Sequence, residues 1–142
     1  MSDLERFVRA QDGVYERARA ELAAGSKRSH WMWFVFPQLT GLGSSAMSVK
    51  YAIAGVDEAR EYLAHPVLGP RLAECAATLL TVEGRTAEQI LGYPDDLKLR
   101  SSMTLFAEAA TDPAVFRQVL ERYYDGPDAR TLQLLGVPQT GW

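Results

Sequence analysis

The chain is poor in the residues that cross-link small proteins or bind metal ions. Among its 142 residues there are one cysteine, Cys75, and two histidines, His30 and His65. A lone cysteine forms no intrachain disulfide, which is typical of proteins in a reducing compartment. Because the histidines and the cysteine lack the spacing of zinc ligands, we expect no zinc site. A magnesium site made of carboxylates remains an alternative, since such sites leave little trace in a sequence.

Long apolar runs and an excess of positive charge are also missing. The longest apolar stretch, Trp31 to Phe36, is far too short to cross a bilayer. The N-terminal residues MSDLERFVRAQ carry charges where a signal peptide needs an apolar run. The net charge is −3, whereas broad nucleic-acid binding usually needs a strongly basic domain. We expect a cytoplasmic protein without a membrane span and without general affinity for nucleic acids.

Sequence motifs that assign a reaction or a cofactor are absent as well. Neither G-x-x-x-x-G-K-[ST] nor G-x-G-x-x-G occurs. The glycine- and serine-rich turn at 41–45 offers backbone N–H groups to an anion, but a plain connecting loop explains it equally well. No serine is marked as an activated nucleophile. The cofactor, and whether the protein is an enzyme, therefore stay open.

The composition that remains is that of a packed helical domain. Hydrophobic residues make up 47% of the chain and charged residues 23%, which excludes wholesale disorder. At this length we expect one domain, residues 1–142, with its core at about 4–135 and a loose tail at 136–142. Apolar residues recur at helical spacing and no run alternates as in a strand. We predict an all-α fold, a single compact domain of several short helices with an aromatic loop segment.

Start and stop signals give the expected helix boundaries. We expect helices at about 4–24, 57–63, 67–80, 87–91, 96–110 and 128–135, and one that begins at Pro113 and ends before Gly126. Pro37 and the pair His65–Pro66 interrupt helices. Between 26 and 56 we expect a short helix or extended segment, a loop and a second short helix. Capping side chains are expected from Ser2 with Glu5, Asp57, Thr86 with Gln89, Asp95, Asp112 and Asp128.

The first polar block runs from Lys27 to Gln38 and contains the aromatic stretch. Its first residues are cationic, and His30 can transfer a proton near neutral pH. Tryptophans offer stacking surfaces and indole N–H donors. This combination suits an anionic ligand with an aromatic part. The alternative is a buried aromatic core flanked by solvated charges.

A second polar block runs from Tyr93 to Phe106. Lys98, Ser101 and Ser102 share a helix face, and two carboxylates, Asp95 and Asp96, stand at the N-terminus of that helix. Serine and threonine lower helix propensity, so they either bond back to a carbonyl one turn earlier or face a pocket. Asp95 alone is also explained as a helix cap.

Four stretches of the sequence are distinctive: RFVRAQDGVY, GSKRSHWMWFVFPQLTGLGSS, HPVLGPRL and PDDLKLRSSMTLF. With them the chain resembles domain-of-unknown-function family 1810 over about Leu4 to Leu135. The resemblance implies a mainly α-helical fold and no established activity. The calpastatin label that some members carry does not fit, because calpastatin is disordered and this composition is that of a packed domain. The family's signature positions are Gln11, Lys27, Arg28, His30, Trp31, Trp33, Pro37, Gln38, Asp95, Asp96, Lys98, Ser101, Ser102 and Thr104.

We expect the two blocks to form a pocket for a small anionic ligand, such as a nucleotide or an ADP-ribose-like molecule. This requires the loop at 26–45 to meet the helix near Asp96. His30 with Asp95 or Asp96 would serve acid–base hydrolysis or transfer. The alternatives are a protein-interaction module or a homodimer that exposes the aromatic block. Candidate binding residues are Gln11, Lys27, Arg28, Trp31, Trp33, Gln38, Lys98, Ser101, Ser102 and Thr104.

Overall fold

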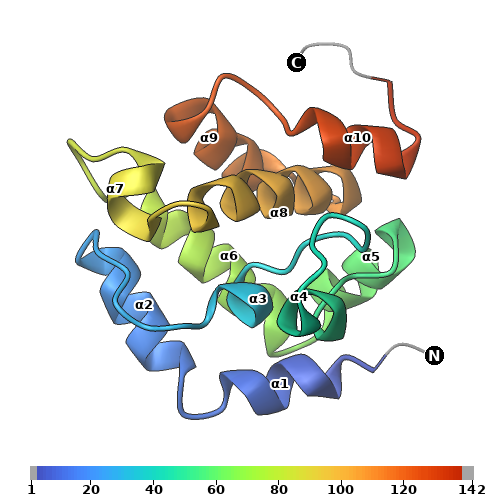
Figure 1. Cartoon of the computed structure of the whole chain (residues 1–142), viewed down its shortest axis with the longest axis horizontal. Helices are drawn as coiled ribbons and strands as arrows, with labels where there is room; N and C mark the ends of the chain where they lie inside the picture. Colours follow the sequence, from blue (N-terminus) through green and yellow to red (C-terminus); the bar gives the residue numbers. More distant parts are fainter. Residues whose placement is uncertain (1–2, 139–142) are drawn as a thin grey trace.

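The longest described helix, α8 (Asp95–Ala109), crosses the middle of the computed structural model (Figure 1). The structure describes residues 3–138. Because other helices lie around α8, most of its side chains from Leu99 onward are buried, although the sequence there is rich in serine and threonine. Its neighbours are α5 (Val56–Ala64), α7 (Ala87–Leu91), α9 (Ala114–Tyr123) and α10 (Ala129–Leu135).

The other helices complete the core beside α8. A row of aromatic rings, Phe7, Tyr62, Phe106 and Phe116, connects α1, α5, α8 and α9, with successive centroids 5.2, 5.2 and 6.1 Å apart. α6 packs against α2, α5 and α9, and α1 packs against α3. The bounds are α1 (Glu5–Gln11), α2 (Tyr15–Ala23), α3 (Met32–Val35), α4 (Ala46–Lys50) and α6 (Leu68–Leu79).

The predicted all-α class is confirmed, since the described residues hold ten helices and no strand. An isolated bridge joins Leu39 to Ile53. In it, Thr40 N–H donates to Ile53 O and Ile53 N–H donates to Gln38 O, each at 2.8 Å. The bridge closes the loop that contains α4 and fixes Gln38 next to α8. No described helix is long and apolar enough to cross a membrane.

Several predicted boundaries are confirmed. The Thr86–Gln89 capping box is present, and α10 begins at an Asp128 cap and ends at Gly136 in the left-handed conformation. The interruption at His65–Pro66 lies between α5 and α6. Cys75 is fully buried. Burial raises its thiol pKa to about 12, so the thiol stays protonated at neutral pH.

Other boundaries were predicted wrongly. The expected helix at 4–24 is two helices, because Gly13 has φ +72° and turns the chain between α1 and α2. Apolar spacing continues across this turn, so periodicity alone hides it. Asp57 and Asp95 are not caps: each lies inside the first turn of its helix, after Gly55 and Pro94. Ser2 and residues 139–142 of the expected tail lie outside the described residues.

Candidate functional site

The segment before α3 meets the first turn of α8, which brings the two polar blocks together. Lys27 N–H donates to Ile90 O at 2.7 Å, which holds the segment beside α7. The Asp95 carboxylate lies between two ammonium groups, 2.9 Å from Lys27 Nζ and 3.3 Å from Lys98 Nζ. The side chains of these three residues are 9 to 21% exposed. The contact required by the pocket hypothesis therefore exists, as a shielded ion cluster.

Each lysine of this cluster also lies near an indole ring. Lys27 Nζ is 5.2 Å from the Trp31 ring centroid, and Lys98 Nζ is 5.3 Å from that of Trp33. Cations at this distance are attracted by the ring face. With a shared carboxylate and two rings, the cluster of Lys27, Asp95 and Lys98 is largely satisfied by the protein itself. It links α3 to α8, and because two lysines share one carboxylate, one positive charge of the cluster is not balanced within it.

The aromatic stretch forms core rather than a stacking surface. Trp31, Met32 and Phe36 are at most 1% exposed, and only Trp33 is half-buried. Of the two tryptophans expected to offer a stacking surface, Trp31 therefore has no exposed ring face. The burial also removes the exposed aromatic surface that an interaction module or a dimer would have used.

Glu21 on α2 holds the start of this segment. Its carboxylate accepts hydrogen bonds from the Arg28 and Ser29 N–H groups, from the Ser29 hydroxyl, and from Trp31 Nε1 at 2.8 Å. Partial burial opposes its ionisation, but these donors outweigh burial and lower the Glu21 pKa to about 2. Glu21 therefore fixes the segment as an ionised acceptor.

The predicted acid–base pair is not formed. His30 is exposed, and no hydrogen bond or ion pair joins it to another described residue. Asp95 is occupied by the two lysines. The Asp96 Oδ1 atom is buried without a hydrogen-bond partner among residues 3–138. Arg28 has an exposed side chain and contributes its backbone N–H to Glu21. The geometry gives no support to catalysis by His30 with Asp95 or Asp96.

Gln11 is a cross-link inside the core, not a ligand contact. Its side-chain Nε2 donates to Phe34 O at 2.8 Å and to the Tyr62 hydroxyl at 3.3 Å, and its Oε1 accepts from Arg71 at 3.2 Å. The side chain is buried, on the same helix as the buried Phe7. Buried amides need such partners because an unpaired polar group in the core is costly.

The hydroxyl groups of α8 divide between two roles. Ser101 and Thr104 donate to the carbonyls one turn earlier, Leu97 O and Arg100 O, at 3.1 and 2.8 Å. Thr104 Oγ1 also accepts from Asp128 N–H at 2.8 Å, which fixes the start of α10. Ser102 is fully buried, and its hydroxyl has no partner among the described residues.

A polar depression of about 360 Å³ lies between the loop at 38–48, the first half of α8 and the start of α10. It collects Gln38, Lys98 and Ser101 from the predicted set, together with Gly43 from the glycine-rich turn. Gly43 is required there, because a Cβ would come within 2.6 Å of the Ser48 side chain. The remaining lining residues are Leu42, Ser48, Pro94, Leu97, Arg100, Asp128 and Arg130.

Cations outnumber carboxylates in this lining. The cations are Lys98, Arg100 and Arg130, and the one carboxylate, Asp128, is used to cap α10 through Thr131. Arg100 pairs with the highly exposed Asp125 at 2.8 Å and donates to Gly126 O. Arg130 is exposed, and no contact joins its guanidinium to another described residue. The depression therefore has donors that the protein does not use.

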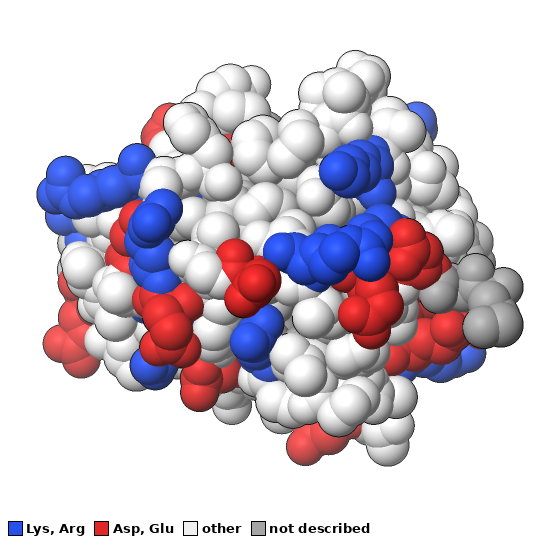
Figure 2. Space-filling view, turned by 90° about the horizontal axis from the view of Figure 1, so that it is seen from below, with Lys and Arg blue, Asp and Glu red and all other residues white. Residues whose placement is uncertain are grey.

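Charge elsewhere is more evenly mixed. Figure 2 shows the face that is lowest in Figure 1, where Lys and Arg side chains alternate with Asp and Glu. Away from the depression, Arg19 lies near both Glu16 and Glu74, and Arg9 lies near Asp3. The described residues contain no group of three or more histidine, cysteine or acidic side chains placed to hold a metal ion.

Comparison with known proteins identifies the relatives of this chain. The family model described as protein of unknown function, DUF1810, matches residues 1–135. The chain belongs to the DUF1810 family. It is 55% identical to the conserved hypothetical protein Rv1873 from Mycobacterium tuberculosis, whose crystal structure superposes with a TM-score of 0.93. The match covers 96% of this chain and 98% of that one. No curated protein matches at a significant level.

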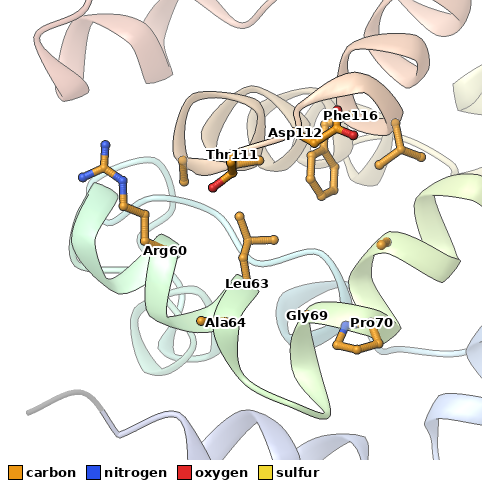
Figure 3. A pocket seen from close by; sticks show the side chains of 12 residues that line it. Arg60, Leu63, Ala64, Gly69, Pro70, Thr111, Asp112 and Phe116 are labelled. Atoms are coloured by element: carbon orange, nitrogen blue, oxygen red, sulfur yellow. The ribbon is translucent and has the colours of Figure 1, made fainter.

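A second hollow of this DUF1810 protein lies away from both polar blocks. It has a volume of about 570 Å³ and lies between the end of α5, the start of α6 and the turn from α8 to α9 (Figure 3). Leu63 and Phe116 point into it, whereas the guanidinium of Arg60 turns away at one edge. Its walls are mostly apolar, and it contains none of the predicted site residues. It is larger than the polar depression but offers fewer specific polar contacts.

The sequence did not reveal three residues that shape the candidate site of this DUF1810 protein. Glu21 looks like one more charge on the exposed face of a helix, and nothing in its neighbours marks it as an acceptor for Trp31. Arg100 and Arg130 also read as solvated helix residues. Arg130 follows the Asp128 cap by two residues, which was the available signal that it stands at a helix start beside the depression.

Proposed function

We propose that this protein binds a small anionic molecule in the depression between α8, α10 and the loop at 38–48. The observation that carries the proposal is the unpaired guanidinium of Arg130 beside Lys98 and Arg100, in a lining whose one carboxylate is already used as a cap. Guanidinium groups bind phosphate and carboxylate oxygens through paired hydrogen bonds.

The polar neighbours support this assignment. Gln38 is half-buried in the lining, and its side-chain amide makes no hydrogen bond to another described residue. The volume of about 360 Å³ is at the lower end of the range for small-molecule sites. We propose binding alone, without a chemical step, and place it in the cytoplasm, in keeping with the single buried cysteine.

A thermal-shift screen against inorganic phosphate, phosphosugars, nucleotides and organic acids tests the proposal. A ligand at 100 times its Kd stabilises the fold by about 2.7 kcal/mol. The shift should be lost in Arg130→Ala, which removes an exposed side chain without disturbing the core. Arg60→Ala is the matched control, since it removes an exposed arginine at the apolar hollow. An anion-induced shift that Arg130→Ala leaves unchanged would contradict the proposal.

A further inference from the structure

The polar depression is bordered by the large apolar side chains that the protein exposes. Among the described residues, four large hydrophobic side chains are exposed: Val49, Tyr93, Leu97 and Leu134. Exposed apolar residues scattered singly over a surface need no explanation. The position of these four is different, because each lies at or beside the lining of the depression.

Leu97 is placed there by the lining itself and Leu134 by a distance, whereas Tyr93 and Val49 are next in sequence to lining residues. Leu97 is part of the lining, and Tyr93 immediately precedes the lining residue Pro94. Val49 follows the lining residue Ser48 on α4. Leu134 on α10 has its Cδ1 atom 3.7 Å from the position of a Cβ on Gly41, next to the lining residue Leu42. The cationic depression therefore has an apolar border.

Tyr93 is the most exposed of the four, at 73%, and it is the aromatic one. Its hydroxyl makes no hydrogen bond to another described residue, so both ring face and hydroxyl are free for a ligand. Leu97, 49% exposed, is itself part of the lining and provides an apolar surface there. The tryptophans do not compete for this role, since Trp31 is buried and Trp33 lies under Lys98.

We propose that the ligand of the depression is a phosphate monoester that carries a planar ring, of the size of a nucleoside monophosphate. The inference rests on the proposed function. The phosphate contacts Arg130 and Lys98, and the ring lies against Tyr93 and Leu97. Arg130 is unpaired, and Lys98 and Arg100 keep N–H donors beyond their ion pairs with Asp95 and Asp125, so the lining suits the several oxygens of a phosphate better than a single carboxylate. The volume of about 360 Å³ admits one nucleotide and not two.

Isothermal titration with adenosine 5′-monophosphate, ribose 5-phosphate and inorganic phosphate tests the inference. Stacking of a base on an aromatic side chain strengthens binding by roughly 10-fold. We therefore expect the nucleotide to bind about 10-fold more tightly than ribose 5-phosphate. Tyr93→Ala should reduce that ratio to about one while ribose 5-phosphate binding stays the same, and Tyr93→Phe should keep the ratio. Both variants change an exposed side chain, so the fold is retained.

The possible outcomes separate the two proposals. If the nucleotide and ribose 5-phosphate bind equally to the unaltered protein, the ring-binding inference is wrong and the anion site stands. If the nucleotide preference survives in Tyr93→Ala, the ring lies elsewhere and the inference is again wrong. If no phosphate compound binds, the inference is wrong whatever the organic acids do. If anion binding survives in Arg130→Ala, the proposed function itself fails.

Discussion

Two sides of α8 use charge in different ways. On the side toward α3, Asp95 pairs with Lys27 and Lys98, and all three side chains are largely shielded. On the side toward α10, Arg130 is exposed beside Arg100 and has no partner among the described residues. The first group is completed by the protein, whereas the second has donors to spare. The number of charged residues in a stretch of sequence therefore does not distinguish a structural cluster from a binding site. What distinguishes them is whether each charged side chain is paired with another one in the folded protein.

The largest expected effect is on the shielded side, where Trp31 is buried. Trp31→Ala should lower the free energy of unfolding by about 4 kcal/mol, because it opens a cavity and removes the indole donor to Glu21. Urea denaturation followed by circular dichroism measures the loss. Tyr93→Ala is the matched aromatic control and should change stability by less than about 0.5 kcal/mol. If Trp31→Ala and Tyr93→Ala lost the same unfolding free energy, the shielded side would not differ from the exposed side in stability.

Asp95→Asn tests whether the ion cluster itself stabilises the fold. Removal of the shared carboxylate leaves two shielded lysines facing each other, which should cost about 2 kcal/mol of unfolding free energy. Asp57→Asn is the control, because Asp57 pairs with Arg60 on an open surface and such pairs contribute at most about 0.5 kcal/mol. A loss for Asp95→Asn no larger than for Asp57→Asn would show that the cluster is not structural.

The pH dependence of stability tests the role of Glu21. Its pKa of about 2 in the folded protein lies below the ordinary glutamate value of 4.5. The stabilisation is therefore complete above about pH 4.5 and is lost as the pH falls toward 2. After allowance for solvent screening we expect about 1 to 2 kcal/mol. In Glu21→Gln this part of the acid-induced loss should disappear, whereas Glu83→Gln, at an exposed position, should keep it. Thermal unfolding between pH 2 and 6 gives both curves.

The smallest expected effect is that of His30. Because the side chain is exposed and unpaired among residues 3–138, His30→Ala should change the unfolding free energy by less than about 0.5 kcal/mol. It should also leave any anion-induced thermal shift intact. Loss of that shift in His30→Ala would move the binding site from the depression to the segment before α3.

Much of the fold follows from local signals in the sequence. The cap at Asp128, the box at Thr86 and the break at His65–Pro66 each act through neighbouring residues, so one sequence suffices to find them. The turn at Gly13 was missed because the apolar spacing continues across it. Asp95 was misread as a cap because its partner Lys27 lies 68 positions away in the sequence, and propensity carries no information on such pairs.

The candidate site was only partly predictable for the same reason. The pocket hypothesis required the two blocks to meet, and the structure brings them together at Asp95, but residue types alone show neither that contact nor which members turn inward. Gln11 and Trp31 became core cross-links, whereas Gln38, Lys98 and Ser101 line the depression. Arg130 joins them because α10 folds back beside α8, a long-range contact through Thr104 and Asp128. Whether a charge stays free depends on such contacts.

We expect an anion to bind in the depression beside Arg130 and not at the segment before α3. Phosphate titration into ¹⁵N-labelled protein, followed by heteronuclear NMR, tests it directly. The account predicts saturable shift changes in the loop at 42–48, around 97–101 and around 128–131, all absent in Arg130→Ala. Changes confined to the apolar hollow near Leu63 and Phe116, or to the segment at 27–31, would contradict it.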